Sequence, residues 1–112
     1  MIDKQGYVRL VDFGLSCYIK RKKEDHFSKI SGTPEYLPPE AFSKTEMIST
    51  SIDWWSFGSL IFEMTIGFPP FYKQNQTIRE MKEKILQDNK FLNYINNSML
   101  RDLLEKLMNK DP

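Results

Sequence analysis

The chain has 112 residues, with 16 Lys and Arg against 15 Asp and Glu, a single Cys and a formal net charge of +1. The balanced charge argues against nucleic-acid binding, which needs a basic surplus. One Cys excludes an internal disulfide and fits a reducing compartment. No stretch reaches the roughly 20 apolar residues that span a bilayer, and no signal peptide is evident. We therefore expect an intracellular, cytoplasmic protein, with a nuclear location also open, that binds neither nucleic acid nor membrane.

The N-terminal residues predict a short β-hairpin. Gly6 can supply the positive φ of a tight turn, and residues 7–11 are apolar apart from Arg9. We expect a strand there, paired with a partner that includes Met1 and Ile2. The partner is so short that the chain is expected to begin inside a structural unit.

The next part of the chain predicts a loop. Hydrophobic periodicity fades over residues 16–31, and residues 20–25 are six consecutive charged residues. Pro34, Pro38 and Pro39 then exclude a regular helix interior, because proline lacks a backbone donor and restricts the residue before it.

Helical patterns begin at about Ser51. Between Trp54 and Ile66 the apolar side chains surround the whole helix, which is typical of a helix buried on nearly all sides. Gly67, followed by Pro69 and Pro70, ends it.

Two amphipathic helices follow. Thr77 and Glu80 form a T-x-x-E capping box, and the helix that they open has an apolar face made of Ile78, Met81, Ile85 and Leu86. The last helix has apolar residues at intervals of three and four, namely Met99, Leu100, Leu103, Leu104, Leu107 and Met108. Its exposed side offers two pairs of opposite charge four residues apart, Arg101 with Glu105 and Asp102 with Lys106.

Three motifs carry the functional information. Asp12-Phe13-Gly14 follows the predicted strand, the run Gly-Thr-Pro-Glu-Tyr-Leu-Pro-Pro-Glu occupies residues 32–40, and Asp-Trp-Trp-Ser-Phe-Gly occupies residues 53–58. The tripeptide alone is a weak signal, but a carboxylate at a strand end suits a divalent cation that bridges phosphates. In this order the three motifs resemble the C-terminal lobe of eukaryotic protein serine/threonine kinases, and the AGC group in particular.

The resemblance implies a mostly α fold: the helical C-terminal lobe of the protein-kinase fold, whose parent is α+β, with a short β-hairpin remnant at the N-terminus. Residues 1–112 would form a partial kinase domain, truncated at both ends. Within it, residues 1–14 would be the strand pair with the Asp-Phe-Gly motif, 15–40 the activation segment, and 41–112 the helical lobe.

The resemblance also assigns catalytic and cofactor roles. Asp12 would ligate Mg²⁺ between the phosphates of ATP, and Phe13 and Gly14 would complete this cofactor-binding motif. Thr33 would hydrogen-bond the catalytic Asp and mark specificity for Ser and Thr.

Other residues are assigned to substrate binding and to structure. The pocket for the residue after the phosphoacceptor would be lined by Pro34, Glu35, Tyr36 and Leu37. Glu63 would bind a basic substrate residue upstream of the acceptor, although a solvated helix Glu is an equal alternative. Glu40 would pair with a later Arg, and Asp53 would be buried and hold the catalytic loop.

The chain also departs from the AGC pattern. The usual phosphorylated Thr of the activation segment is Lys29 here, and the cation that helps to hold its phosphate is Cys17. We expect no phosphate switch at the usual site. Ser28 or Ser31 would be the substitute phosphosite, with residues 20–23 as partners.

We therefore expect part of a serine/threonine kinase that transfers the γ-phosphoryl of ATP, with Mg²⁺, to protein substrates that carry basic residues near the acceptor. The 112 residues contain no Gly-rich loop and no His-Arg-Asp loop, so the parent chain is expected to supply the N-lobe and catalytic loop. The fragment alone is expected to be inactive, with exposed apolar patches and an unpaired Glu40. The alternative is a non-catalytic binding module or decoy built on a kinase C-lobe.

Overall fold

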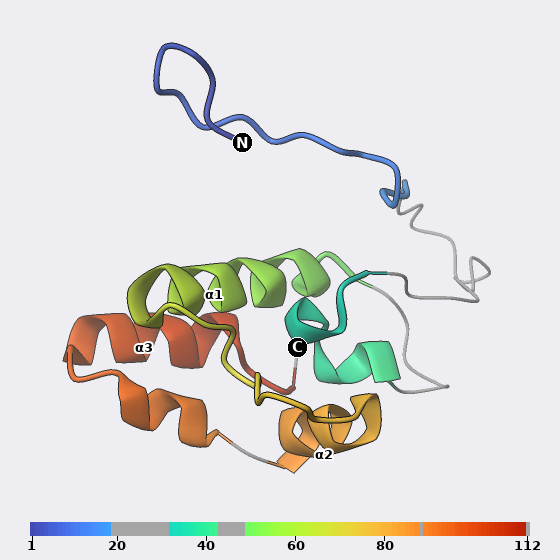
Figure 1. Ribbon diagram of the computed structural model, residues 1–112, viewed down its shortest axis with the longest axis vertical. Helices are drawn as coiled ribbons and strands as arrows, with labels where there is room; N and C mark the ends of the chain where they lie inside the picture. The colour runs from blue at the N-terminus through green and yellow to red at the C-terminus, as the bar shows by residue number, and fades with distance from the viewer. Residues whose placement is uncertain (19–31, 43–48, 88, 112) are drawn as a thin grey trace.

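The computed structural model describes residues 1–18, 32–42, 49–87 and 89–111. In chain order these residues form the short 3₁₀-helices η1 (Pro34–Tyr36) and η2 (Pro39–Phe42), the helices α1 (Ser51–Ile66) and α2 (Ile78–Gln87), the 3₁₀-helix η3 (Lys90–Tyr94) and α3 (Ser98–Leu107) (Figure 1). The described part is thus mostly helical, as expected. None of its helices is both long and apolar enough to cross a membrane.

The core lies between α1 and α3, which run side by side, and continues toward α2, which lies beside η2 (Figure 1). Its buried side chains are Trp55, Phe62, Phe71, Met81, Ile85, Phe91, Leu92, Ile95, Leu104 and Met108. Four of these ten side chains are aromatic. The ring of Phe62 meets those of Phe68, Phe91 and Tyr94 edge-on, an arrangement that adds to the stabilisation from buried area.

Helices α1 and α3 approach closely at Gly58. A Cβ atom on Gly58 would lie 2.6 Å from Cγ of Met108 and 3.1 Å from Cβ of Leu107. The absence of a side chain therefore lets the two helices pack at this distance. Farther along, α1 ends at Gly67, whose φ of 97° closes the last turn through a hydrogen bond from its N–H to the carbonyl of Glu63.

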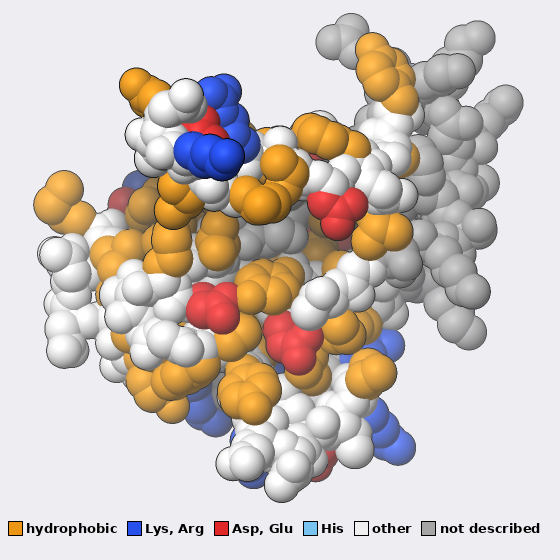
Figure 2. Space-filling model, turned by 45° about the horizontal axis from the view of Figure 1, so that its top comes forward, with side chains coloured by type: hydrophobic (Ala, Val, Ile, Leu, Met, Phe, Trp, Pro, Cys, Tyr) orange, Lys and Arg blue, Asp and Glu red, His pale blue; other side chains and the backbone are white. Residues whose placement is uncertain are grey.

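The expectation that α1 is buried on nearly all sides is wrong within the described structure. One stripe faces the core, with Trp55, Gly58, Ser59 and Phe62 buried. The opposite stripe is exposed and apolar, and consists of Trp54, Phe57, Leu60 and Met64. Figure 2 shows hydrophobic side chains gathered on this side of the molecule. The described segments do not cover this stripe, so the expected exposed apolar patch is confirmed.

The start of α2 follows the predicted local signal. Glu80 Oε2 accepts hydrogen bonds from the N–H and hydroxyl of Thr77, at 2.7 and 2.9 Å, and the Glu80 N–H donates to the Thr77 hydroxyl. The capping box is thus confirmed, as is the Asp102–Lys106 ion pair, at 2.6 Å. No ion pair joins Arg101 to Glu105 among the described residues.

The apolar faces of α2 and α3 are narrower than expected. Met81 and Ile85 of α2 and Leu104 of α3 are buried, but the outermost predicted positions are exposed. These are Ile78, Leu86, Met99 and Leu103.

The N-terminal segment forms the expected turn but not the expected strands. Gly6 has a φ of 88°, and Asp3 Oδ1 accepts hydrogen bonds from the N–H groups of Gln5 and Tyr7. Backbone hydrogen bonds join Met1 with Arg9 and Asp3 with Tyr7 across this turn. The pairing amounts to one isolated antiparallel bridge, between Ile2 and Val8, and not to a pair of strands. The physical reason is that a two-stranded ribbon is stable only when it packs an apolar face on other elements. Residues 1–18 are largely exposed and lie at a distance from the helices (Figure 1).

Candidate functional site

The junction between η1 and α1 holds the predicted substrate-binding residues. The Tyr36 hydroxyl donates a short hydrogen bond to Oε2 of Glu63, one turn before the end of α1. Both side chains are half-buried. The structure therefore joins two residues, 27 positions apart, that were assigned separately from the sequence.

A second contact fastens η1 to the same helix. The hydroxyl of Ser56 lies 3.0 Å from the carbonyl oxygen of Tyr36 and 3.0 Å from that of Ile52. Ser56 and Glu63 are seven positions apart and so share one face of α1. Tyr36 is thus held at its backbone and at its hydroxyl by one face of the same rigid helix.

The local sequence sets the shape of η1. Pro34 occupies the first helical position, where its fixed φ is favourable and its missing N–H costs nothing. The N–H of Tyr36 then donates to the carbonyl of Thr33 at 3.1 Å, and that of Leu37 to the carbonyl of Pro34 at 3.2 Å. Thr33 itself is exposed.

The electrostatics of the junction favour a neutral Tyr36. The hydrogen bond to Glu63 raises the pKa of Tyr36 to about 12, with burial and the charges of Glu63 and Glu35 acting in the same direction. The phenol thus remains a donor to Glu63 throughout the physiological range. Glu63 accepts this bond on Oε2, and among the described residues its Oε1 has no hydrogen-bond partner.

Glu40 lies in η2 and is buried, with 5% of its surface exposed. Its Oε1 accepts a hydrogen bond from the Ser51 hydroxyl at the start of α1, at 3.3 Å. None of the ion pairs between described residues includes Glu40. Among the described residues, the Ser51 hydroxyl is thus the hydrogen-bond partner of this buried carboxylate.

Asp53 does not occupy the buried position that the resemblance implied. It lies in the first turn of α1 and is exposed, because no described segment covers that turn. Its N–H donates to the carbonyl of Thr50 at 3.2 Å.

The Asp12-Phe13-Gly14 motif lies away from the η1–α1 junction (Figure 1). Asp12 has a positive φ of 64°, and its Oδ1 accepts a 3.3 Å hydrogen bond from the Gly14 N–H. All three residues are exposed. No hydrogen bond between described residues joins this segment to the helices.

The residues present fit a divalent cation only in part. Asp12 offers carboxylate oxygens, the donor type that Mg²⁺ prefers. Its positive φ changes the direction of the chain next to this carboxylate. Within the described ranges no group of three or more His, Cys, Asp or Glu side chains gathers around a common point. Asp12 therefore offers one candidate donor, and the described residues do not complete a metal site around it.

Some predicted positions lie outside the described residues, and some contacts were missed. Ser28, Ser31 and Lys29 fall within the undescribed range 19–31, and Cys17 is exposed. The contacts of Ser51 and Ser56 were not predicted. The only available signal for Ser56 was its spacing of seven from Glu63 within the Trp-rich motif.

Comparison with known proteins gives a consistent result. The protein kinase domain family matches residues 1–112. The chain is 40% identical to the serine/threonine protein kinase ypkA of Aspergillus fumigatus, with 100% of the chain and 17% of that protein covered. It is 41% identical to the serine/threonine-protein kinase Sgk1 of Rattus norvegicus, with 99% of the chain and 25% of that protein covered. It is 37% identical to the cAMP-dependent protein kinase type 3 of Saccharomyces cerevisiae, with 99% of the chain and 26% of that protein covered. The chain thus spans about a quarter or less of the length of these relatives.

Proposed function

Because the chain belongs to the protein kinase domain family, we propose that it forms part of a serine/threonine protein kinase that transfers the γ-phosphoryl group of ATP to Ser or Thr of protein substrates. The relatives named as serine/threonine kinases match the whole chain. The observation that carries the proposal for this chain is the junction of Tyr36 with Glu63.

The junction suits a substrate-docking surface. Pro34, Glu35, Tyr36 and Leu37 would line the pocket for the residue after the acceptor, and α1 supports this loop through Ser56 and Glu63. Oε1 of Glu63, which has no hydrogen-bond partner in the described part of the chain, would bind a basic substrate residue, because a carboxylate that is already oriented loses less freedom on binding. A loop fixed in this way would present the acceptor in a defined position.

The remaining assignments are also proposals. Asp12, with Phe13 and Gly14, would hold Mg²⁺, which supplies charge neutralisation on the phosphates of ATP when it is bound. Thr33 would position the catalytic Asp, Glu40 would stabilise the end of the activation segment, and Asp53 would hold the catalytic loop. Ser28 or Ser31 would accept a regulatory phosphate.

The proposed organisation assigns residues 1–14 to the strand pair and metal motif, 15–40 to the activation segment and 41–112 to the helical lobe. We expect the 112 residues by themselves to be inactive, because they include no Gly-rich loop and no His-Arg-Asp loop.

The direct test uses the parent kinase chain that contains these residues, with ATP, Mg²⁺ and a basic peptide. The wild type should phosphorylate Ser or Thr in the peptide. Asp12→Asn should lower kcat by at least about 100-fold, as expected for loss of a group that stabilises transition-state charge. Asp102→Asn, which changes an exposed Asp of α3, should leave kcat unchanged. A parent chain that binds the peptide but transfers no phosphate would instead establish the binding-module alternative.

A further inference from the structure

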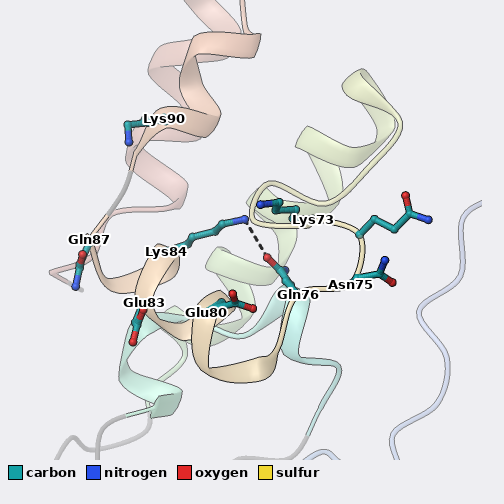
Figure 3. Close-up of a pocket in the computed structure, with 9 residues that line it drawn as sticks. Lys73, Asn75, Gln76, Glu80, Glu83, Lys84, Gln87 and Lys90 are labelled. Atoms are coloured by element: carbon teal, nitrogen blue, oxygen red, sulfur yellow. Dashed lines mark hydrogen bonds between the residues drawn. The ribbon is translucent and has the colours of Figure 1, made fainter.

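A polar cavity lies between α2 and the loop that precedes it, with Lys90 of η3 on its rim (Figure 3). Its volume of about 570 Å³ falls in the range of roughly 300–1,000 Å³ that is usual for small-ligand pockets. The described residues that line it include three lysines, four side-chain amides and two glutamates. It involves neither Asp12 nor the Tyr36–Glu63 junction.

Lys84 is held in position by a short chain of hydrogen bonds. Gln76 donates from Nε2 to the carbonyl of Phe71 at 2.9 Å. The amide oxygen of Gln76 then accepts a 2.9 Å bond from Nζ of Lys84 (Figure 3). An ammonium group has three N–H donors, so this bond leaves two for a ligand. No ion pair between described residues includes Lys84.

A second ammonium group reaches toward the first. Figure 3 shows the side chains of Lys73 and Lys84 pointing toward one another above Gln76. Like charges in this arrangement repel, and a bound anion between them relieves the repulsion. The positive charges of both lysines also contribute to the lowered pKa of nearby Glu80, whose main cause is the backbone hydrogen bond from Thr77.

The two glutamates of the cavity are engaged elsewhere. The Glu80 carboxylate accepts the N–H and hydroxyl of Thr77 in the capping box. Glu83 pairs with Nε of Arg79 at 3.2 Å. Neither forms an ion pair with Lys73 or Lys84, although the charges of both lysines act on Glu80 from a longer distance.

We propose that this cavity binds a small ligand that carries several phosphate charges. Lysines bind phosphate as point charges, and side-chain amides add hydrogen-bond donors for its oxygens. The concave shape and the volume favour a small molecule over an extended polymer. This site is separate from the residues assigned to phosphoryl transfer.

The test is calorimetric titration of the parent kinase chain with sodium tripolyphosphate, without Mg²⁺ and with the nucleotide site filled by a saturating ATP-competitive inhibitor. We expect one tripolyphosphate per chain, with an affinity that falls as salt rises. The double variant Lys73→Gln/Lys84→Gln should bind at least about 10-fold more weakly, as expected for loss of two close charges. The single variant Lys73→Gln, at an exposed position, should show an intermediate loss.

The matched control removes two positive charges from α3, in the double variant Arg101→Gln/Lys106→Gln, and should bind like the wild type. Unchanged inhibitor binding shows that each variant is folded. The proposal is overturned if tripolyphosphate does not bind at low ionic strength, or if the cavity variant and the α3 variant lose affinity equally. Because the nucleotide site is blocked and no transfer is measured, this result does not depend on kinase activity.

Discussion

The Tyr36 hydroxyl in η1 donates a hydrogen bond to the carboxylate of Glu63 in α1, 27 residues later in the chain. Tyr36→Phe removes the donor and leaves both oxygens of a half-buried carboxylate without a partner among the described residues. We expect a loss of about 1.5 kcal/mol in the free energy of unfolding, near the lower end for hydrogen bonds to charged groups. Urea unfolding of the parent chain measures it. Tyr72→Phe, at an exposed tyrosine, is the control, and an equal effect of both variants would contradict the account.

The same bond makes stability depend on pH in alkaline solution. The pKa of Tyr36 is raised from 10.0 to about 12 in the folded state, chiefly by the hydrogen bond to Glu63. The folded protein therefore retains a proton that the unfolded chain loses. The stabilisation is complete below pH 10 and is lost as the pH rises toward about 12.

The measurement for this prediction is the difference in the free energy of unfolding between wild type and Tyr36→Phe, followed from neutral to alkaline pH. Subtraction removes the contributions of other tyrosines and of lysines. We expect a constant difference up to about pH 10 that then decreases. A difference that stays constant or grows above that pH would show that the two groups are not bonded in solution.

Close packing at Gly58 predicts an unusual result for a Gly→Ala change within a helix. Helix propensity alone would favour Ala by about 1 kcal/mol, but the new Cβ would lie 2.6 Å from Met108 Cγ. Overpacking costs about 1–3 kcal/mol, so we expect net destabilisation by Gly58→Ala in thermal unfolding. In a Met108→Ala background the penalty should shrink. Stabilisation by Gly58→Ala in the wild-type background would mean that α1 and α3 lie farther apart.

The capping box of α2 predicts a local loss of stability. Thr77→Ala removes the hydroxyl that accepts the Glu80 N–H, and should cost about 1 kcal/mol. Helix opening near α2 should appear as faster amide exchange there than in α3. Ser98→Ala at the first residue of α3 is a control, since no described hydrogen bond involves its side chain, and should leave exchange in α2 unchanged.

The same capping box predicts how the free energy of unfolding changes at acidic pH. The hydrogen bond from the Thr77 N–H is the main reason that the pKa of Glu80 is lowered in the folded state. This contribution to stability is present above the pKa of the unfolded chain and is lost as the pH falls through the lower folded pKa. Glu80→Gln should therefore weaken the acid dependence of unfolding. An unaltered acid dependence would contradict the assigned hydrogen bonds.

Local signals in the sequence predicted much of the fold. Gly67 ends α1 and Thr77 with Glu80 begins α2, because each signal acts within one helical turn. The 3₁₀-helix η3 was not predicted, since five residues are too few to show a period. The burial of α1 was overestimated. Apolar residues all around a helix indicate that it needs neighbours on every side, but the described residues pack against α1 on one side.

The candidate site was predictable as a set of residues but not as a geometry. Motif order identified Tyr36 and Glu63 separately, yet their contact depends on how η1 docks on α1. The same holds for Ser56 with the Tyr36 carbonyl and for Ser51 with Glu40. Hydroxyl contacts between segments leave no pattern in the sequence, because serine is mostly found on exposed surfaces, where it needs no such partner.

The most direct test of the account is a peptide-specificity measurement on the parent kinase chain. Two acceptor peptides are compared, one with Arg upstream of the acceptor and its twin with Ala at those positions. For the wild type, kcat/KM should favour the Arg peptide, and Glu63→Gln should reduce that preference by about 10-fold, equivalent to about 1.4 kcal/mol, mainly through KM. Glu105→Gln on the exposed side of α3 should leave the preference intact. A preference that is unchanged in Glu63→Gln, or equally reduced in Glu105→Gln, would contradict the assignment of the Tyr36–Glu63 junction to substrate binding.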